Sequence, residues 1–535
     1  MRLQVRPWLL WVCCAAVLVA PLFLAAIPPL TDYPNHLARA YVLADGAQDP
    51  TLAQIYAARW RVIPNLALDL VMAPLLRILP LYMAGRVVLA GALLLPMLAV
   101  ALYNRALFRR VTVWPLVSAL VAYNGAFLLG LVNFLFAVSA AFATAALWIA
   151  WRERAPRITV IMAALGAVVV FFCHLTGLPV LLVLIGAYEC DRWLVVNEGP
   201  VELVRTRVMP MIGVFLPCVV LYRLSPTAAA SGATERISWL VKPYLLLASV
   251  INYGVFLDVV SGCFLLLLLG VALKQGWLIM PRVTRIAVAT MAALVLLAPF
   301  RVKGGAYLDF RFAVVLALIL IAGIGQTAAL GRRAPAVLLC VVGLFAIRYA
   351  VLVGAWRHQD ADLAAIRQAV QAVPAASRVL IVTADQADAP DYWAGAPRNR
   401  TLGGIVPANE HMAAVALIER KAFFQTFFAD PTQQPVAVLP PYRASASPTA
   451  SWGAPSYSAL GQADLGPWLR AAHPYLVGWW KRFDYVLVLN AEAVPSGDKF
   501  LPRCLVPVSA TGLAAVYRIQ ATDNVRSGAD CAAAG

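Results

Sequence analysis

The stretch MAGRVVLAGALLLPMLAVALY, residues 83–103, decides the fold class of this chain. It is long enough to cross the hydrocarbon core of a bilayer as one helix, which takes roughly 20 apolar residues. Apolar segments of similar length recur through the first two thirds of the sequence. A transmembrane β-barrel would instead show segments of about ten residues that alternate between apolar and polar side chains, and the sequence lacks that pattern. We therefore predict a polytopic α-helical membrane protein.

The recurring apolar segments predict about eleven membrane spans. The first is the run from Trp8 to Ile27, which follows a basic N-terminus. We interpret it as an uncleaved helix rather than a signal peptide, because it is long for a signal sequence and further spans follow. The other spans are expected at 83–103, 112–131, 133–151, 158–175, 177–193, 208–223, 254–273, 285–300, 312–330 and 335–354.

Basic residues between the spans predict the orientation of the chain. The short connections on one side all carry Lys or Arg, whereas the tight turns near residues 132 and 176 on the other side carry neither. Because basic loops stay in the cytoplasm, we expect the N-terminus inside a cytoplasmic (inner) membrane and the C-terminal part outside. This pattern also explains most of the net charge of +17, so we exclude nucleic acid as a partner.

The composition changes near residue 355, where the predicted membrane module, residues 1–355, ends. We expect residues 356–535 to form a soluble α/β domain outside the membrane, without a glycine-rich phosphate loop, a CxxC motif or a GxSxG motif. Its predicted elements are helices at 360–373 and 409–428, strands at 378–383, 435–439 and 485–489, and a loop at 440–456. Cys504 and Cys531 lie in this domain and can pair there. The other seven cysteines lie in or beside apolar spans and are interpreted as buried small hydrophobic residues.

The first outside loop, residues 28–82, contains the polar segment TDYPNHLAR at 31–39. Asp32 follows the first span closely, so its carboxylate should lie near the membrane surface. If the segment is helical, His36 and Arg39 share one face of it. The alternative is that the Thr-Asp pair only caps that helix. Later in the same loop, residues 66–80 are apolar with two charges at helical spacing, which predicts a helix lying on the membrane.

Other outside segments add cations, a histidine and a carboxylate. The segment RVKGGAYLDFR, residues 301–311, places three cations and Asp309 between two spans. Cations at that depth suit a phosphate headgroup, and the alternative is an ion pair of Asp309 with a neighbouring arginine. His174 ends a span on the same side, where it is either functional or a packing residue. The candidate substrate-binding residues are His36, Arg39, Arg59, Arg61, His174, Arg301, Lys303, Asp309 and Arg311.

All these groups are predicted on one side of the membrane. A transporter would place polar groups near the midplane, in broken helices of two related halves, and the sequence shows no repeat between its halves. The sequence therefore favours surface chemistry on a lipid-borne substrate, with a lipid-linked glycan transporter or a non-catalytic envelope assembly protein as alternatives.

Over residues 1–355 the layout resembles the membrane glycosyltransferases of the GT-C superfamily. The segments TDYPNHLAR, PNLALDL at 64–70 and YLDFRF at 307–312 are similar to those of a largely uncharacterised bacterial branch. The resemblance implies a polyprenyl-phosphate-linked sugar as donor and a hydroxyl on a glycan, lipid or protein as acceptor. It also implies Asp32 as general base of an inverting transfer, with outside cations stabilising the departing lipid phosphate.

One feature departs from that pattern. Many members of the superfamily carry two adjacent acidic residues in the first loop, whereas here Tyr33 follows Asp32. Either Asp32 acts alone or the activity has been lost or changed. No cofactor is implied, and one aspartate with scattered histidines does not form a metal coordination set, although a role for a divalent metal stays open.

Overall fold

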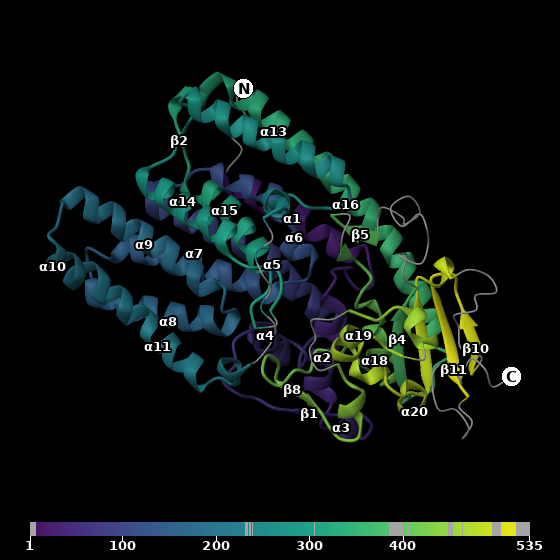
Figure 1. Ribbon diagram of the computed structural model, residues 1–535. Coiled ribbons are helices and arrows are strands. Elements are labelled where there is room, and N and C mark those ends of the chain that lie inside the picture. The colour runs from purple at the N-terminus through teal and green to yellow at the C-terminus, as the bar shows by residue number, and fades with distance from the viewer. Residues whose placement is uncertain are drawn as a thin grey trace.

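The computed structural model describes residues 7–230, 234, 237, 239–303, 305–384, 400–403, 406–447, 453–462, 464–494 and 504–520. Within these ranges the chain forms a bundle of helices that carries a small mixed α/β domain at one end (Figure 1). Six helical segments are long and apolar enough to cross a membrane. They are α5 (Leu81–Phe108), α7 (Val132–Trp151), α8 (Pro156–Cys173), Pro200–Leu224, α13 (Val255–Lys274) and α16 (Ala334–Val370). The chain is therefore a multi-pass membrane protein.

Most of the other predicted spans are shorter or more charged helices at the expected positions. The first span is α1 (Pro7–Val19) continued by the 3-10 helix η1 (Ala20–Phe23). The other three are α9 (Gly177–Val196), α14 (Arg282–Leu297) and α15 (Leu308–Gly323). Hydropathy therefore located these helices correctly, although their lengths vary more than a uniform bilayer thickness suggests.

The predicted span at 112–131 is wrong as a continuous helix. It consists of the 3-10 helix η2 (Trp114–Val121) and the single turn α6 (Gly125–Leu128). The side chain of Asn124 joins the two pieces, because its amide donates to the Val121 carbonyl at 2.8 Å and its oxygen accepts from Phe127 N at 3.0 Å. Irregular backbone is tolerated at membrane depth where protein groups satisfy it.

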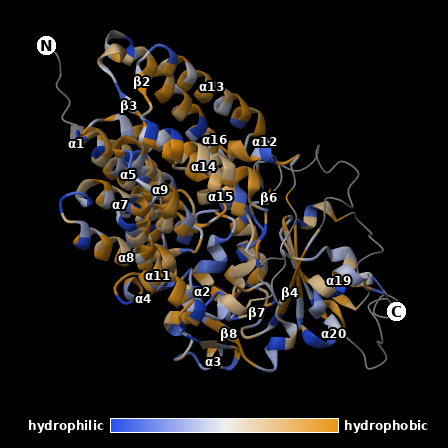
Figure 2. Cartoon of the chain, turned by 60° about the vertical axis from the view of Figure 1, so that its left-hand side comes forward, coloured by the Kyte–Doolittle hydropathy of each residue, from blue (hydrophilic) through white to orange (hydrophobic). Residues whose placement is uncertain are grey.

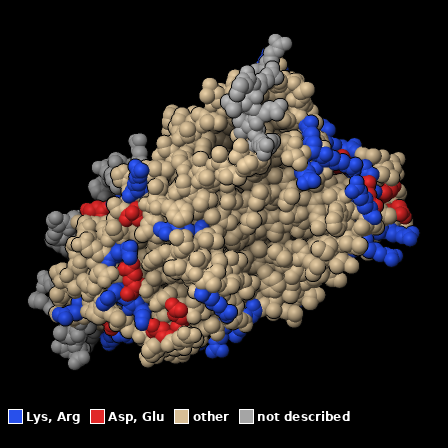
Figure 3. Space-filling view, turned by 180° about the vertical axis from the view of Figure 1, so that it is seen from behind, with Lys and Arg blue, Asp and Glu red and all other residues tan. Residues whose placement is uncertain are grey.

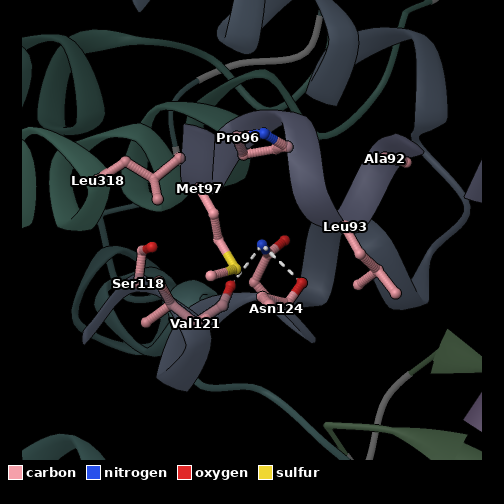
Figure 4. Close-up of a pocket in the computed structure, with 9 residues that line it drawn as sticks. Ala92, Leu93, Pro96, Met97, Ser118, Val121, Asn124 and Leu318 are labelled. Atoms are coloured by element: carbon pink, nitrogen blue, oxygen red, sulfur yellow. Dashed lines mark hydrogen bonds between the residues drawn. The ribbon is translucent and has the colours of Figure 1, made fainter. Parts of the chain in front are cut away.

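The segment still runs from one end of the bundle to the other. At one end the Trp114 indole donates to the carbonyl of Ile321, near the end of α15. At the other end the Leu129 carbonyl accepts from the backbone of Asp32. The cavity beside Asn124 measures about 10 Å³ (Figure 4). That volume suits about one water molecule, so this cavity is a packing gap and not a substrate site.

Charged and apolar side chains are segregated on the surface. In Figure 3 the Lys and Arg side chains gather mainly at two ends of the molecule, one near α10 (Pro200–Leu203) and one at the α/β domain. A broad band with few charges lies between them, and Figure 2 shows that the bundle helices are mostly hydrophobic. Leu266 of α13 and Leu339 of α16 are 63% and 74% exposed. Such a band is the surface that lipid covers.

Ion pairs join several of the connections that we predicted to be cytoplasmic. Glu189 accepts from Arg207 at 2.8 Å and from Arg152 at 3.3 Å. Arg282 pairs with Asp191 at 2.6 Å. The loops after α7 and α9 and the start of α14 therefore lie together at one end, as the charge pattern requires. The side of the membrane on which this end lies stays a prediction.

The α/β domain is connected to the bundle without a break. Helix α16 (Ala334–Val370) contains both the predicted last span and most of the predicted helix at 360–373, so residue 355 lies inside a continuous helix. The central sheet has the strand order β10-β11-β9-β4-β7. Strand β4 is parallel to β7 and β9, and β11 is antiparallel to β9 and β10. The strands are β4 (Arg378–Thr383), β7 (Phe423–Phe424), β9 (Tyr485–Leu489), β10 (Leu505–Ala510) and β11 (Ala514–Ile519).

The structure corrects one feature of the predicted domain. The helix expected at 409–428 ends early: the 3-10 turn η9 (Met412–Ala414) leads into α18 (Val415–Arg420), and Lys421 stops it with φ of 53°. Strand β7 then follows where helix was expected. The loop expected at 440–456 begins with the 3-10 helix η10 (Tyr442–Ser445), and residues 448–452 lie outside the described residues.

The predicted strand at 435–439 exists, but it does not join the central sheet. Strand β8 (Val436–Val438) pairs antiparallel with β1 (Tyr56–Ala58) of the first outside loop. The Tyr56 ring also packs on Phe427 at 4.8 Å between centroids. This pairing fixes the α/β domain against the loop that contains Asp32, and it places the two segments side by side (Figure 1).

The cysteines differ partly from expectation. The seven in or beside the spans are free, but Cys13, Cys263 and Cys340 are exposed on the bundle surface rather than buried within it. A thiol there meets lipid, which is also apolar, so composition does not separate the two environments. Cys504 is disulfide-bonded, and Cys531 lies outside the described residues.

Candidate functional site

Asp32 lies where the first apolar helix ends and α2 (Tyr33–Asp45) begins. It occupies the N-cap position, yet its side chain makes no capping hydrogen bond, so the carboxylate is left for another role. The backbone N–H groups of Thr31 and Asp32 donate to the carbonyls of Leu128 and Leu129 at 3.1 and 3.0 Å. The turn after α6 therefore holds the backbone of Asp32 in place.

Gly130 makes this backbone contact between Asp32 and the turn after α6 possible. Its φ is +82°, and a Cβ there would lie 2.9 Å from Tyr33 N and 3.0 Å from Asp32 N. Both the backbone conformation and the close approach exclude a side chain. The position of Asp32 thus depends on a glycine far along the chain.

We expect Gly130→Ala to destabilise the protein by about 1–3 kcal/mol, because the variant combines a strained φ with a steric conflict. The measurement is the thermal unfolding midpoint of the purified protein in detergent. Gly343→Ala is the matched control, since Gly343 lies in α16 with open space around it. If Gly130→Ala unfolds at the same temperature as the control, the backbone contact beside Asp32 does not require glycine at position 130.

Charged groups from three parts of the chain surround Asp32. Packing of protein around the carboxyl group raises its pKa to about 7, and the negative charge of Glu410 adds to this rise. Arg311 and Arg39 oppose it. Although the surroundings are dense, 28% of the Asp32 side chain remains exposed. A reactant can therefore reach a carboxylate whose pKa lies near neutrality.

Two of the neighbours come from the α/β domain. His411 Nε2 lies 3.7 Å from Asp32 Oδ1. Burial raises the pKa of Glu410 to about 7 and lowers the pKa of His411 to about 4. Sequence reasoning missed both residues, because a Glu-His pair before an apolar segment looks like an ordinary helix start. Packing of the α/β domain on the first outside loop and on α2, which includes the β1–β8 pair, brings this segment to Asp32.

A second set of neighbours precedes α15. Tyr307 has a left-handed φ of 61°, and burial raises its pKa, with Glu410 and Asp32 adding to the effect. Arg311, in the first turn of α15, is 9% exposed, and its guanidinium lies 5.8 Å from the Phe134 ring. The Arg311 Nε atom has no hydrogen-bond partner among the described residues. This buried cation is therefore available to an anion that is not part of the protein.

His174 approaches the same cluster from the end of α8. Its ring contacts Phe134 edge-on at 6.3 Å, and Phe134 is also the aromatic ring beside Arg311. Its Nδ1 accepts the backbone N–H of Thr176 at 3.2 Å. That contact leaves the proton of the neutral ring on Nε2.

His36 and Arg39 are both buried on α2. Arg39 forms a bidentate pair with Asp69 of α4 (Ala67–Leu75), with distances of 2.8 and 2.9 Å. Helix α4 confirms the helix predicted after residue 66, and its Asp69 faces Arg39 rather than the membrane surface. The His36 ring packs on Phe428 at 5.2 Å, and its Nδ1 lacks a hydrogen-bond partner in the described part of the chain.

Other candidates have different contacts. Asp309 pairs with Lys242 at 2.6 Å and not with a neighbouring arginine. Lys303 donates to the Ala228 carbonyl at 2.7 Å, and Arg301 lies over the Phe300 ring at 5.9 Å. Arg59 and Arg61 are exposed beside β1, and among the described residues they are not groups that shift the pKa of Asp32.

The site thus combines Asp32, Arg311, Tyr307, Glu410 and His411, with His36, Arg39 and His174 around them. Within the described residues, no cluster of three or more His, Cys, Asp or Glu side chains could hold a metal ion. A carboxylate with a near-neutral pKa beside a buried cation can accept a proton while an anion forms nearby.

No protein-family model and no curated protein matches this chain. The chain is similar to a solved structure, that of ArnT from Cupriavidus metallidurans bound to undecaprenyl phosphate. The likeness covers 98% of this chain and 99% of that one, with a TM-score of 0.52 and 12% sequence identity. At this identity the likeness concerns the fold. It confirms the GT-C-like membrane fold that the sequence predicted.

Proposed function

Because the chain has the fold of ArnT, we propose that it is a glycosyltransferase that moves a sugar from a polyprenyl-phosphate-linked donor to an acceptor hydroxyl. The solved ArnT structure holds undecaprenyl phosphate, which is the type of lipid that remains when a sugar leaves such a donor. In this chain the observation that carries the proposal is a partly exposed carboxylate, Asp32, within electrostatic range of the buried cation Arg311. We place the reaction at the outer face of the cytoplasmic membrane.

In the proposed reaction Asp32 acts as general base. The acceptor oxygen forms a bond to the anomeric carbon from the face opposite the phosphate, and the hydroxyl proton passes to the Asp32 carboxylate. The bond between that carbon and the phosphate oxygen breaks, and its electron pair stays on the phosphate. The sugar is therefore inverted, and the polyprenyl phosphate leaves with one more negative charge.

That new charge needs stabilisation in the transition state. Arg311 is buried, and its Nε atom lacks a hydrogen-bond partner in the described ranges, so it suits a phosphate oxygen. Arg301 is a second candidate, because it also acts on Tyr307 at the same site. Arg39 is already committed to Asp69, so we assign it a supporting electrostatic role.

We expect kcat/KM to rise with pH through about pH 7. The base must be ionised to accept a proton, and the pKa of Asp32 is raised to about 7, so below that pH the active fraction falls about tenfold per pH unit. The measurement is the initial rate of polyprenyl phosphate release from about pH 5 to about pH 9. A profile that is flat below neutrality would show that no carboxylate with a raised pKa limits the reaction.

The test of the proposed function uses the purified full-length chain with a panel of polyprenyl-phosphate sugars and hydroxyl acceptors. Release of polyprenyl phosphate together with a glycosylated acceptor supports the proposal, provided that Asp32→Asn abolishes both. Movement of a lipid-linked glycan across a vesicle bilayer without release of polyprenyl phosphate would favour a transporter instead. Turnover of no donor in the panel would overturn the proposal.

A further inference from the structure

Asn35 links α2 to the α/β domain directly beside Asp32. Its side chain is fully buried, its oxygen accepts from Phe428 N at 2.9 Å, and its amide donates to the Thr426 carbonyl at 2.8 Å. These two bonds fix which side of the amide carries the oxygen. The second amide hydrogen then faces His411 Nδ1, at 3.4 Å.

This arrangement determines the protonation of His411. An Nδ1 atom that faces an amide donor acts as acceptor, so the proton of the neutral ring lies on Nε2. The ring is 6% exposed and packs edge-on against Phe428 at 5.0 Å, so its orientation is held. Nε2 is the atom that faces Asp32 Oδ1 at 3.7 Å. Asn35, His411 and Asp32 thus form a directed chain of donors and acceptors.

We propose that His411, held by Asn35 with its proton on Nε2, is a positioning residue for Asp32, so that the α/β domain completes the active site. This inference rests on the proposed function. The 3.7 Å separation is longer than a hydrogen bond. Contacts of this kind are often long before substrate binds and shorten when the reactants are in place.

The anchoring of the domain supports this role. Besides the β1–β8 pair, the backbone of Arg59 donates to the Pro435 carbonyl at 2.7 Å, and that of Leu439 donates to the Ile55 carbonyl at 2.8 Å. Helices α2 and α18 also lie side by side (Figure 1). His411 therefore reaches Asp32 from a domain that is tied to the first outside loop at several points.

Glu410 acts on Asp32 in the opposite direction from His411. An N–H that faces the carboxylate favours its ionised form, whereas a nearby negative charge disfavours it. Gly453 leaves room for Glu410, because a Cβ at that glycine would lie 2.3 Å from Glu410 Oε1. The titratable and charged groups around the Asp32–His411 pair are His36 and Arg39 of α2, Arg301, Tyr307 and Arg311 before and at the start of α15, and Glu410 of the α/β domain.

The test measures polyprenyl phosphate release as a function of pH for four variants. We expect His411→Leu and His411→Asn to lower kcat about 10- to 100-fold. Both should also shift the acidic limb of the pH–rate profile to higher pH, because both remove the donor that faces the carboxylate. His411→Gln places an N–H near the Nε2 position, so it should keep most of the activity. Glu410→Gln should shift the acidic limb to lower pH, because it removes the negative charge beside Asp32. The KM for the donor should stay within about twofold in the His411 variants, because positioning of the base is not donor binding.

Control variants separate this role from a general effect on folding. His473 is a buried histidine of the same domain whose Nδ1 contacts the Tyr475 hydroxyl at 2.7 Å, and His473→Gln should keep the wild-type rate and profile. If His411→Leu does not fold, the test compares the two polar variants His411→Asn and His411→Gln with each other. Equal rates and profiles for these two variants overturn the inference.

The same experiment distinguishes the two proposals. Loss of turnover in Asp32→Asn together with a wild-type profile in His411→Asn would leave the proposed function intact and remove the role of His411. Turnover that persists in Asp32→Asn would remove the proposed base itself.

Discussion

Replacing Asp32 by asparagine is expected to slow sugar transfer by about a hundredfold to ten-thousandfold, which is the usual contribution of a general base. Asparagine keeps the size of the side chain and cannot accept the acceptor proton at neutral pH. The backbone of Asp32 is held by the carbonyls after α6 rather than by its carboxylate, so the variant should fold. The measurement is kcat with a saturating donor, together with the thermal unfolding midpoint.

A second aspartate on the same helix serves as the control. Asp45 is the last residue of α2 and is exposed, so Asp45→Asn should transfer sugar at the wild-type rate. Asp32→Glu should retain part of the activity, because it keeps the carboxylate but moves it by one methylene. If Asp32→Asn and Asp45→Asn have the same kcat, Asp32 is not the base.

Replacing Asp69 by alanine is expected to destabilise the protein by about 3–5 kcal/mol, because it leaves the fully buried Arg39 without its partner. The lost contact is a bidentate pair between α2 and α4, at 2.8 and 2.9 Å. The measurement is unfolding by heat or denaturant in detergent.

The double variant Arg39→Met, Asp69→Leu tests the same argument from the other direction. It removes both charges and fills the space with apolar groups, so most of the lost stability should return. The exposed pair of Arg470 and Asp464 gives the matched control, and Asp464→Ala should cost no more than about 1 kcal/mol. If Asp69→Ala and Asp464→Ala lose the same free energy of unfolding, burial of the Arg39–Asp69 pair does not make its loss more destabilising.

The double variant also bears on the role of Arg39 in catalysis. The sequence placed Arg39 among the candidate substrate-binding residues, whereas in the structure it is paired with Asp69. We expect the double variant to keep the donor KM within about threefold, since Arg311 and not Arg39 is our principal phosphate ligand. A large rise in the donor KM would show that Arg39 contributes to donor binding.

Much of the fold was predictable because it depends on local composition. Long apolar segments such as 83–103 form helices, and short apolar runs rich in Val, Leu and Ile form strands at the predicted positions 378–383 and 485–489. The segment 112–131 is the exception. Its hydropathy is that of a span, but Pro115 opens a 3-10 helix and Asn124 satisfies the backbone where that helix breaks. Hydropathy reports apolar content and not the hydrogen bonds that allow a helix to break.

The candidate site was predictable only in part. The sequence singled out Asp32 and Arg311, and the structure brings them close enough for the arginine to lower the pKa of the carboxyl group. The sequence also singled out Asp309, whose partner is Lys242, and its predicted alternative partners were the neighbouring arginines. Two membrane helices, α13 and α14, separate Lys242 from Asp309 along the chain, so spacing could not identify it.

By itself, then, the sequence determined that TDYPNHLAR follows the first of many membrane helices, and it predicted that cations and a carboxylate gather on one side. Helix formation and membrane orientation depend on hydropathy and charge, which are local properties of the chain. Only the tertiary structure decided which of those charges meet, and that Glu410 and His411 join Asp32 from the α/β domain. Those contacts depend on the pairing of β1 with β8 and on the burial of Asn35, because distant segments interact only after packing brings them together.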